Sequence, residues 1–387
     1  ENMTSCGQPL GTTDYPMTKH SDDYWMYQSA LQHPMRTMDP EQAKLFFVPL
    51  YLNAIGRSIS KVDFHLCVHS RHHYDRTDVT TSPAAADTDA ETKTRCFIRK
   101  QSGGLFKWAD EILGKSIYFQ RSQGRDHVLV SSHYVMKRRA RQFTSYPNLL
   151  SCNRVVFENF PQQPWFSMLP KRIEMPSLYV ANNHGCAPSP SKSADFVMIA
   201  SMKDRPTFKS RHRICRWLSP SSSSSIPNGN FIENNNSSTN VANNRRSLSA
   251  RRSNGAGHNF SVSLCGEGPM CPTLAQSRFG FHPRGDTLGS NRLADTIMSE
   301  TIPIFTEKEQ YDIVPDFVPF HEIGEYVDVS SEAKFLQKMD SLSKLSDEEY
   351  DRRLSRLKEF KDLCDFTSGQ PFDAYMAKVA REIGLQE

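Results

Sequence analysis

Short apolar runs alternate along the chain with segments whose apolar residues recur at helical spacing. The runs have the length of strands and are nearly continuous, which is typical of parallel strands covered on both faces. Predicted strands cover residues 45–52, 127–131, 154–160, 172–180, 195–201, 260–265, 278–282 and 301–305, and predicted helices cover 21–33, 105–113, 211–218, 290–298, 330–339, 346–360 and 371–383. Strands that alternate with helices in this way predict an α/β fold with parallel sheets.

The length of 387 residues suits two domains, each long enough to bury a core of its own. We expect one domain over 1–190, a second over 191–345, and separate C-terminal helices over 346–387. Residues 68–95 are polar and predict a loop insertion. Residues 219–258 are dominated by Ser and Asn. They bury too little apolar area to offset chain entropy, so we predict a disordered insertion there.

Residues 277–307 form the most informative stretch, because they predict a strand, a turn at Gly285, a helix and another strand. Ser290 is the expected N-cap of the helix. Free backbone amides and the helix dipole make such a helix start suited to anions. Arg284 and Arg292 add positive charge that could fork to phosphate oxygens. On pattern alone, an ordinary βαβ unit remains the alternative.

The same stretch resembles the C-terminal signature of exostosin-like glycosyltransferases, which runs approximately SRFCLCPxGDxxxSxRLxEAIxxGCIPVI. It departs from the signature at Asp295, where the family usually has Glu, and at Glu300 and Thr301, which replace Gly-Cys. The positions in register are Ser277, Arg278, Phe279, Pro283, Gly285, Asp286, Ser290, Arg292, Leu293, Ile297, Ile302 and Pro303.

Two further phrases resemble the same family and occur in the family's order. Residues 37–53, TMDPEQAKLFFVPLYLN, are similar to a phrase near the start of its N-terminal domain. Residues 122–134, SQGRDHVLVSSHY, are similar to its GxDHFxxxxHD, with Tyr134 in place of the final Asp. Together with weaker similarity up to Val329, the resemblance covers most of the chain.

The resemblance implies a GT-B arrangement, in which two Rossmann-like domains face a cleft, with the acceptor on the side of the first and the nucleotide sugar on the second. It implies inverting transfer of a sugar from a nucleotide sugar, expected to be UDP-linked, to a glycan or glycoprotein. No cofactor or metal is expected. The alternative is a catalytically inactive homologue that binds glycans or stabilises a partner, and the resemblance leaves a homodimer or heterodimer open.

Such a reaction needs a general base and groups that stabilise the leaving diphosphate. We expect Asp126 and His133 as catalytic residues, and His127 as either a core or a functional residue. Arg292 is expected at an exposed position, reaching back over the helix N-terminus, with Asp295 one turn later holding ribose or sugar hydroxyls. The expected nucleotide-sugar-binding residues are Lys203, Arg205, Arg284, Gly285, Ser290, Asn291, Arg292 and Asp295. Lys203 and Arg205 could equally be exposed loop charges.

The nine cysteines include no CxxC pair, which argues against a structural zinc site. They are either buried free thiols or disulfides of the secretory pathway, with Cys67–Cys96 and Cys265–Cys271 as the first pairs to consider. N-glycosylation sequons begin at Asn2, Asn235, Asn236 and Asn259, and they favour the secretory pathway.

The net charge of +4 is spread along the chain, so no nucleic-acid partner is expected. No apolar run reaches the length of a membrane helix. The chain starts at Glu1 rather than Met, and the resemblance implies a lumenal Golgi protein whose N-terminal membrane anchor is missing from this sequence.

Overall fold

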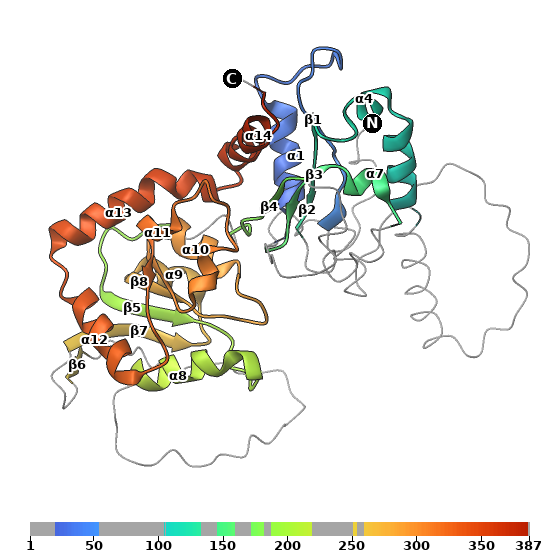
Figure 1. Ribbon diagram of the computed structural model, residues 1–387. Helices are drawn as coiled ribbons and strands as arrows, with labels where there is room; N and C mark the ends of the chain where they lie inside the picture. Colours follow the sequence, from blue (N-terminus) through green and yellow to red (C-terminus); the bar gives the residue numbers. More distant parts are fainter. Residues whose placement is uncertain are drawn as a thin grey trace, which may run out of the picture. The chain divides into compact units, whose positions relative to one another are not determined.

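The structure is a computed structural model in which two compact units are built from alternating strands and helices (Figure 1). It describes residues 20–53, 104, 106–132, 145–158, 172–181, 187–218, 251–253 and 259–385. Unit 1 comprises 1–184, 311–319 and 360–387, and unit 2 comprises 185–310 and 320–359. The predicted domain boundary at 190 lies close to this division, whereas the residues after 345 are divided between the two units.

Unit 1 contains a four-stranded parallel sheet in the order β1-β2-β3-β4. The strands are β1 (Phe46–Phe47), β2 (His127–Ser131), β3 (Asn153–Val156) and β4 (Glu174–Pro176). Phe46 pairs with His127, and Val128 pairs with Asn153. β1 is much shorter than the run 45–52, because Pro49 has no N–H to offer to the ladder.

Helices from both ends of the chain complete unit 1. They are α1 (Asp22–Gln32), a helix over 106–115, α4 (Ile117–Ser122), α7 (Pro147–Leu150), the short 3-10 turn η7 (Asp362–Cys364) and α14 (Gln370–Glu382). Tyr375 on α14 is fully buried; its hydroxyl donates to the Pro176 carbonyl at 2.8 Å and accepts from the Leu178 amide at 3.0 Å. The last helix is therefore part of unit 1 and not of a separate C-terminal segment.

A buried carboxylate ties the carboxyl ends of these strands to α1. Asp22 accepts hydrogen bonds from Asn53 Nδ2 at 2.8 Å, Ser132 Oγ at 2.7 Å and Ser177 Oγ at 2.6 Å. Burial nevertheless dominates and raises the pKa of Asp22 to about 6. This cluster is structural in character, since each carboxylate oxygen is already occupied by a neighbouring side chain.

Unit 2 contains a six-stranded sheet in the order β10-β9-β8-β5-β7-β6. The strands are β5 (Ala194–Ile199), β6 (Arg251–Ser253), β7 (Asn259–Gly266), β8 (Ser277–His282), β9 (Ile302–Phe305) and β10 (Glu325–Tyr326). All pairings are parallel except that of β6 with β7. The prediction of a disordered insertion over 219–258 is wrong for residues 251–253. These residues form β6, because they gain backbone hydrogen bonds by extending the edge of the sheet. Residues 219–250 and the insertion at 68–95 lie outside the described residues.

The helices of unit 2 are α8 (Lys209–Leu218), α9 (Met270–Ala275), α10 (Arg292–Met298), α11 (Phe320–Ile323), α12 (Glu332–Ser343) and most of α13 (Asp347–Lys361), with 3-10 turns η5 (Pro206–Phe208) and η6 (Lys308–Tyr311). The crossover from β5 to β7 runs in the direction opposite to those from β7 to β8 and from β8 to β9, and α8 lies on one side of the sheet while α9 and α10 lie on the other (Figure 1). Among the described helices, none is long and apolar enough to cross a membrane. The α/β fold with two parallel sheets is thus confirmed.

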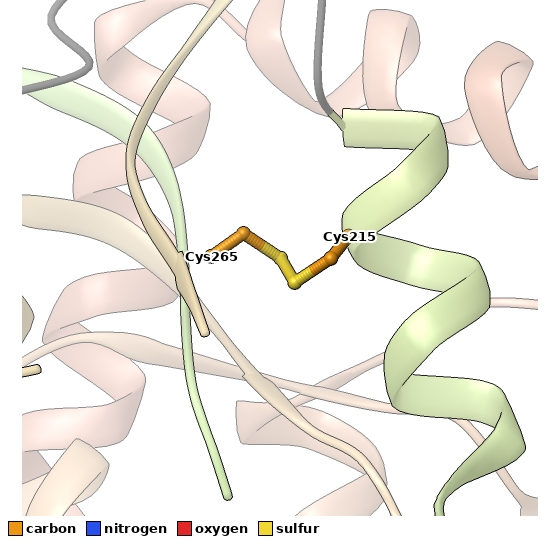
Figure 2. Close-up of a disulfide and its surroundings, with 2 residues drawn as sticks. All are labelled: Cys215 and Cys265. Atoms are coloured by element: carbon orange, nitrogen blue, oxygen red, sulfur yellow. A yellow bond between two sulfur atoms is a disulfide. The ribbon is translucent and has the colours of Figure 1, made fainter. Parts of the chain in front are cut away.

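A disulfide joins Cys215 on α8 to Cys265 on β7 (Figure 2). The predicted pair Cys265–Cys271 is therefore wrong, since Cys265 bonds to a cysteine 50 residues earlier in the chain. Cys271 is also in a disulfide, and Cys67–Cys96 lies outside the described residues. Sequence proximity is a poor guide here, because parallel strands and their crossover helices bring distant cysteines together.

Candidate functional site

The loops that follow β5 and β8 meet at the point where the strand order of unit 2 reverses. After β5 the chain crosses to β7 on one side, and it then returns past β5 to β8 on the other side. Open α/β sheets bind ligands at such a switch point, at the carboxyl ends of the strands. Arg211 Nε donates to the Arg284 carbonyl at 2.9 Å and Arg211 Nη1 donates to the Ser201 carbonyl at 2.9 Å, so one side chain joins both loops.

Arg211 comes from the first turn of α8, where a cation is opposed by the positive end of the helix dipole. The first turn holds no acidic residue, and Lys209 adds a second positive charge. The Arg211 guanidinium lies 3.8 Å from the centre of the Phe208 ring, and burial lowers its pKa. A helix start with this charge pattern favours a bound anion.

Gly285 allows Arg211 to approach the loop after β8. A Cβ atom at this position would lie 2.8 Å from Arg211 Nη2, which is closer than van der Waals contact permits. The glycine was predicted to take part in nucleotide-sugar binding, and in the structure it makes space for an arginine.

Arg292 carries a buried positive charge at this site. It is only 9% exposed, and neither Nε nor Nη1 has a hydrogen-bond partner within the described residues. Burial, helped by the nearby Arg211, lowers the pKa of Arg292 to about 10, and Asp295 opposes the shift. The expectation of an exposed Arg292 was wrong, because the helix that carries it packs its first turn into the unit. A buried cation without partners is costly unless a ligand supplies the missing acceptors.

The start of α10 differs from the prediction by one residue. Asn291, and not Ser290, is the N-cap residue, and its side chain makes no capping hydrogen bond. Instead, Asn291 Nδ2 donates to Asp295 Oδ2 at 3.2 Å. Ser290 Oγ is buried and, in the part of the chain that is described, has no hydrogen-bond partner. Ser290 therefore does not cap the helix. Its hydroxyl is instead a second unsatisfied polar group, two positions before Arg292 in the sequence.

Of the remaining predicted residues, Arg284, Arg205 and Lys203 are more exposed than Arg292, whereas Asp295 is buried. Arg284 Nη1 lies 3.3 Å from Glu307 Oε2, while its Nε is buried without a partner among the described atoms. Arg205 forms an exposed ion pair with Asp286 at 2.6 Å, which joins the loop after β5 to the loop after β8. Lys203 is exposed. Asp295 is 1% exposed, so its carboxylate is not open to solvent.

Two further residues of the site were not predicted from the sequence. His282 is the last residue of β8 and is 1% exposed, and neither ring nitrogen has a well-formed hydrogen bond within the described residues. Burial, helped by Arg292 and Arg211 and only partly offset by the Leu288 backbone, lowers the pKa of His282 to about 3, so the ring is neutral. The signature has Cys at this position, so the resemblance gave no signal.

Gln310 holds together the two loops that follow β8 and β9. It is fully buried, and its Nε2 donates to the carbonyls of His282 at 2.8 Å and Leu288 at 3.0 Å. Its Oε1 accepts from the amides of Thr306 at 2.9 Å and Glu307 at 3.0 Å. One side chain thus satisfies four backbone groups of the two loops that follow β8 and β9.

Of the two catalytic candidates in unit 1, only Asp126 lies within the described residues. Asp126 directly precedes β2, so it lies at the amino end of the strand, opposite to the edge where ligands bind. Its carboxylate accepts from Ser122 Oγ and lies 2.6 Å from His127 Nδ1. His127 is buried and stacks on Phe46 with ring centres 4.7 Å apart, as a core residue does. This position does not support Asp126 as the general base, and His133 lies outside the described residues.

Glu300 departs from the signature at a position that glycine would suit. Its φ of 53° lies in the left-handed region, directly after the C-cap residue of α10. Its carboxylate pairs with Lys358 at 3.0 Å. Glu300 follows the end of α10 that leads into the amino end of β9, and the site lies at the opposite end of that helix. The substitution therefore has no direct contact with the residues described above.

The site collects positive charge and unsatisfied donors from two loops at one edge of a parallel sheet. Buried guanidinium groups suit a ligand with several anionic oxygens, such as a diphosphate. No group of three or more metal-capable side chains occurs among the described residues. An α/β protein of two units, each with its own largely parallel sheet, is consistent with the GT-B type of fold, which has two Rossmann-like domains.

A family model described as the exostosin GT47 domain matches residues 12–339, which is most of the chain. The protein therefore belongs to the exostosin GT47 family of glycosyltransferase domains. No curated protein matches the chain.

Proposed function

We propose that this protein transfers a sugar from a nucleotide sugar, of the UDP-linked class, to a glycan or glycoprotein acceptor, with inversion at the anomeric carbon. The observation that carries the proposal is the buried guanidinium of Arg292, whose Nε and Nη1 lack partners in the described structure. Arg211 and Arg284 meet across the same switch point. Family membership supports the same reaction class.

In this mechanism the arginines act on the leaving group. As the bond between the sugar and the diphosphate breaks, negative charge grows on the diphosphate oxygens. Fixed, partly desolvated guanidinium groups stabilise that charge more than they stabilise the ground state. Removing one such contact is expected to cost about 2–4 kcal/mol of transition-state stabilisation, or roughly a 30- to 1000-fold loss of rate. Ser290 Oγ could donate to the same oxygens.

The acceptor hydroxyl must lose a proton, and we propose His133 as the general base. It comes two residues after the end of β2 in the sequence, and the carboxyl ends of parallel strands are where ligands bind. Tyr134 stands where the family has Asp, so His133 lacks that carboxylate as an orienting neighbour in the sequence. His133→Ala should lower kcat by at least about 100-fold and leave UDP affinity unchanged; an unchanged kcat would remove His133 from the mechanism.

We also propose a lumenal location in the secretory pathway, with a Golgi membrane anchor outside this sequence. The Cys215–Cys265 disulfide supports an oxidising compartment. Mass mapping of protein from its native source, alkylated without reduction, tests this proposal. Finding Cys215 and Cys265 both alkylated would count against a lumenal location.

The test of the reaction is a panel of nucleotide sugars with mixed glycan acceptors, followed by NMR of the product. We expect one UDP-sugar to be consumed only when acceptor is present, and an anomeric configuration opposite to that of the donor. Binding of a UDP-sugar without turnover for any acceptor would instead favour a glycan-binding or partner-stabilising homologue, whether in a homodimer or a heterodimer. No binding of any nucleotide sugar would contradict both functions.

A further inference from the structure

Arg211 is one turn from Cys215 on α8, so the position of its guanidinium depends on how this helix is held. The two residues are four positions apart and therefore lie on the same side of the helix. Cys215 is bonded to Cys265 near the end of β7, and Figure 2 shows the bond spanning the gap between the helix and the strand.

The same end of β7 also holds the loop that Arg211 contacts. The Ala200 amide donates to the Gly266 carbonyl at 2.9 Å, and the Met202 amide donates to Glu267 Oε1 at 3.1 Å. Between them, the Ser201 carbonyl accepts from Arg211 Nη1. Residues on both sides of Ser201 are thus fixed by the two residues that follow Cys265.

These contacts close a ring. It runs from Arg211 along one turn of α8 to Cys215, across the disulfide to Cys265, through Gly266 to the loop after β5, and back to Arg211 through the Ser201 carbonyl. Apart from the disulfide and the Arg211 side chain, every link is a backbone segment or a hydrogen bond. The disulfide is therefore the only bond in the ring that covalently joins α8 to the end of β7, and breaking it lets the first turn of α8 move relative to that strand end.

We propose that the Cys215–Cys265 disulfide is a positioning element of the anion site, which holds Arg211 in place for a ligand diphosphate. The inference rests on the proposed function, since Arg211 matters only if this edge binds a diphosphate. Two-electron reduction by a dithiol, which becomes oxidised to its own disulfide, would break the S–S bond and leave two protonated thiols. The site would then lose affinity while the unit stays folded.

The effect is expected to be specific for phosphate. A small displacement of a charged group that contacts the ligand costs about tenfold or more in affinity. The Cys215→Ala/Cys265→Ala double variant should therefore bind UDP about tenfold more weakly than the wild type, and should bind uridine unchanged. Cys152→Ala is the matched control, because Cys152 is a buried free thiol of unit 1. It should leave the affinity for both ligands unchanged.

A double-mutant cycle with Arg211→Met separates positioning from general loosening. If the disulfide acts through Arg211, then removing it from an Arg211→Met protein should not weaken UDP binding any further. Calorimetric titrations are made at a temperature at which circular dichroism shows every variant to be folded. Reduction of the wild type with dithiothreitol should reproduce the affinity of the double variant.

Three results are distinguishable. Unchanged UDP affinity in a folded Cys215→Ala/Cys265→Ala protein would overturn the proposal and leave the disulfide a stabilising link only. An equal loss in the Arg211→Met background would also overturn it. Failure of the wild type to bind UDP would instead overturn the proposed function itself.

Discussion

Replacing Arg292 by Met should change stability and ligand affinity in opposite directions. Burial lowers the pKa of Arg292 to about 10, well below the usual value for a guanidinium. This means that the charged form is less favourable in the folded state than in the unfolded state. At about 1.36 kcal/mol per pKa unit, burying this charge costs the unliganded fold about 3 kcal/mol at neutral pH, net of the compensation by Asp295. Met has a similar length and no charge, so Arg292→Met should raise the free energy of unfolding by up to about 3 kcal/mol.

Arg292→Met also removes the Nε and Nη1 donors, which have no acceptor within the described residues and which we assign to the diphosphate. Hydrogen bonds to charged groups contribute about 1.5–3 kcal/mol each, so losing the two N–H groups should weaken UDP binding by at least about 100-fold. Arg292→Lys keeps the charge but lacks the planar fork, and should recover only part of the affinity. Urea unfolding and calorimetric titration with UDP, on the same preparation, measure both quantities.

Arg278 provides a matched control on the same unit. It lies at the amino end of β8. Its Nη1 is 3.8 Å from Asp195 Oδ1, and its guanidinium is 4.3 Å from the centre of the Tyr350 ring. Arg278→Met should therefore lose stability and keep UDP affinity. If Arg292→Met behaved like this control, Arg292 would be a structural cation and the assignment of the site would be refuted.

Three other substitutions test the surroundings of the site and the fold. Gly285→Ala places a Cβ 2.8 Å from Arg211 Nη2, so it should weaken UDP binding about tenfold with little change in Tm; normal affinity would contradict the steric role. Gln310→Leu leaves four buried backbone groups unpaired, so urea unfolding should show a loss of about 3–5 kcal/mol, and a loss below 1 kcal/mol would contradict this reasoning. Burial raises the pKa of Asp22 from 3.8 to about 6, so its contribution to stability is fully present below pH 3.8 and is lost as the pH rises through 6. Asp22→Asn should therefore gain about 2 kcal/mol relative to the wild type between pH 4 and pH 7, whereas a constant difference in unfolding free energy would contradict the shift.

The strands and the signature could be predicted from the sequence because both are local patterns. β2 occupies the residues predicted for it, and Arg284, Gly285, Ser290 and Arg292 come to one edge through a single strand–turn–helix unit. Arg211 could not be predicted as their partner. It is 73 residues before Arg284, and no spacing rule connects a helix start to a loop that follows a different strand.

The burial of individual side chains and the identity of their partners could not be predicted from the sequence either. Arg292 was expected to be exposed, but the packing of α10 covers all of its seven residues. Arg251–Ser253 looked like part of a polar insertion, yet a strand edge can recruit polar residues through backbone hydrogen bonds alone. The partner of Cys265 depended on the crossover from β5 through α8 to β7, which no cysteine spacing encodes.

The most direct measurement of the central claim is calorimetric titration of the wild-type protein with UDP and, separately, with uridine. The two ligands differ only in the diphosphate, so their ratio of affinities reports what the switch-point arginines contribute. Two charge-assisted contacts predict that UDP binds at least about 100-fold more tightly than uridine, and that the excess shrinks as salt is added. Equal affinities for UDP and uridine, or no binding of UDP at all, would contradict a diphosphate site at this edge of unit 2.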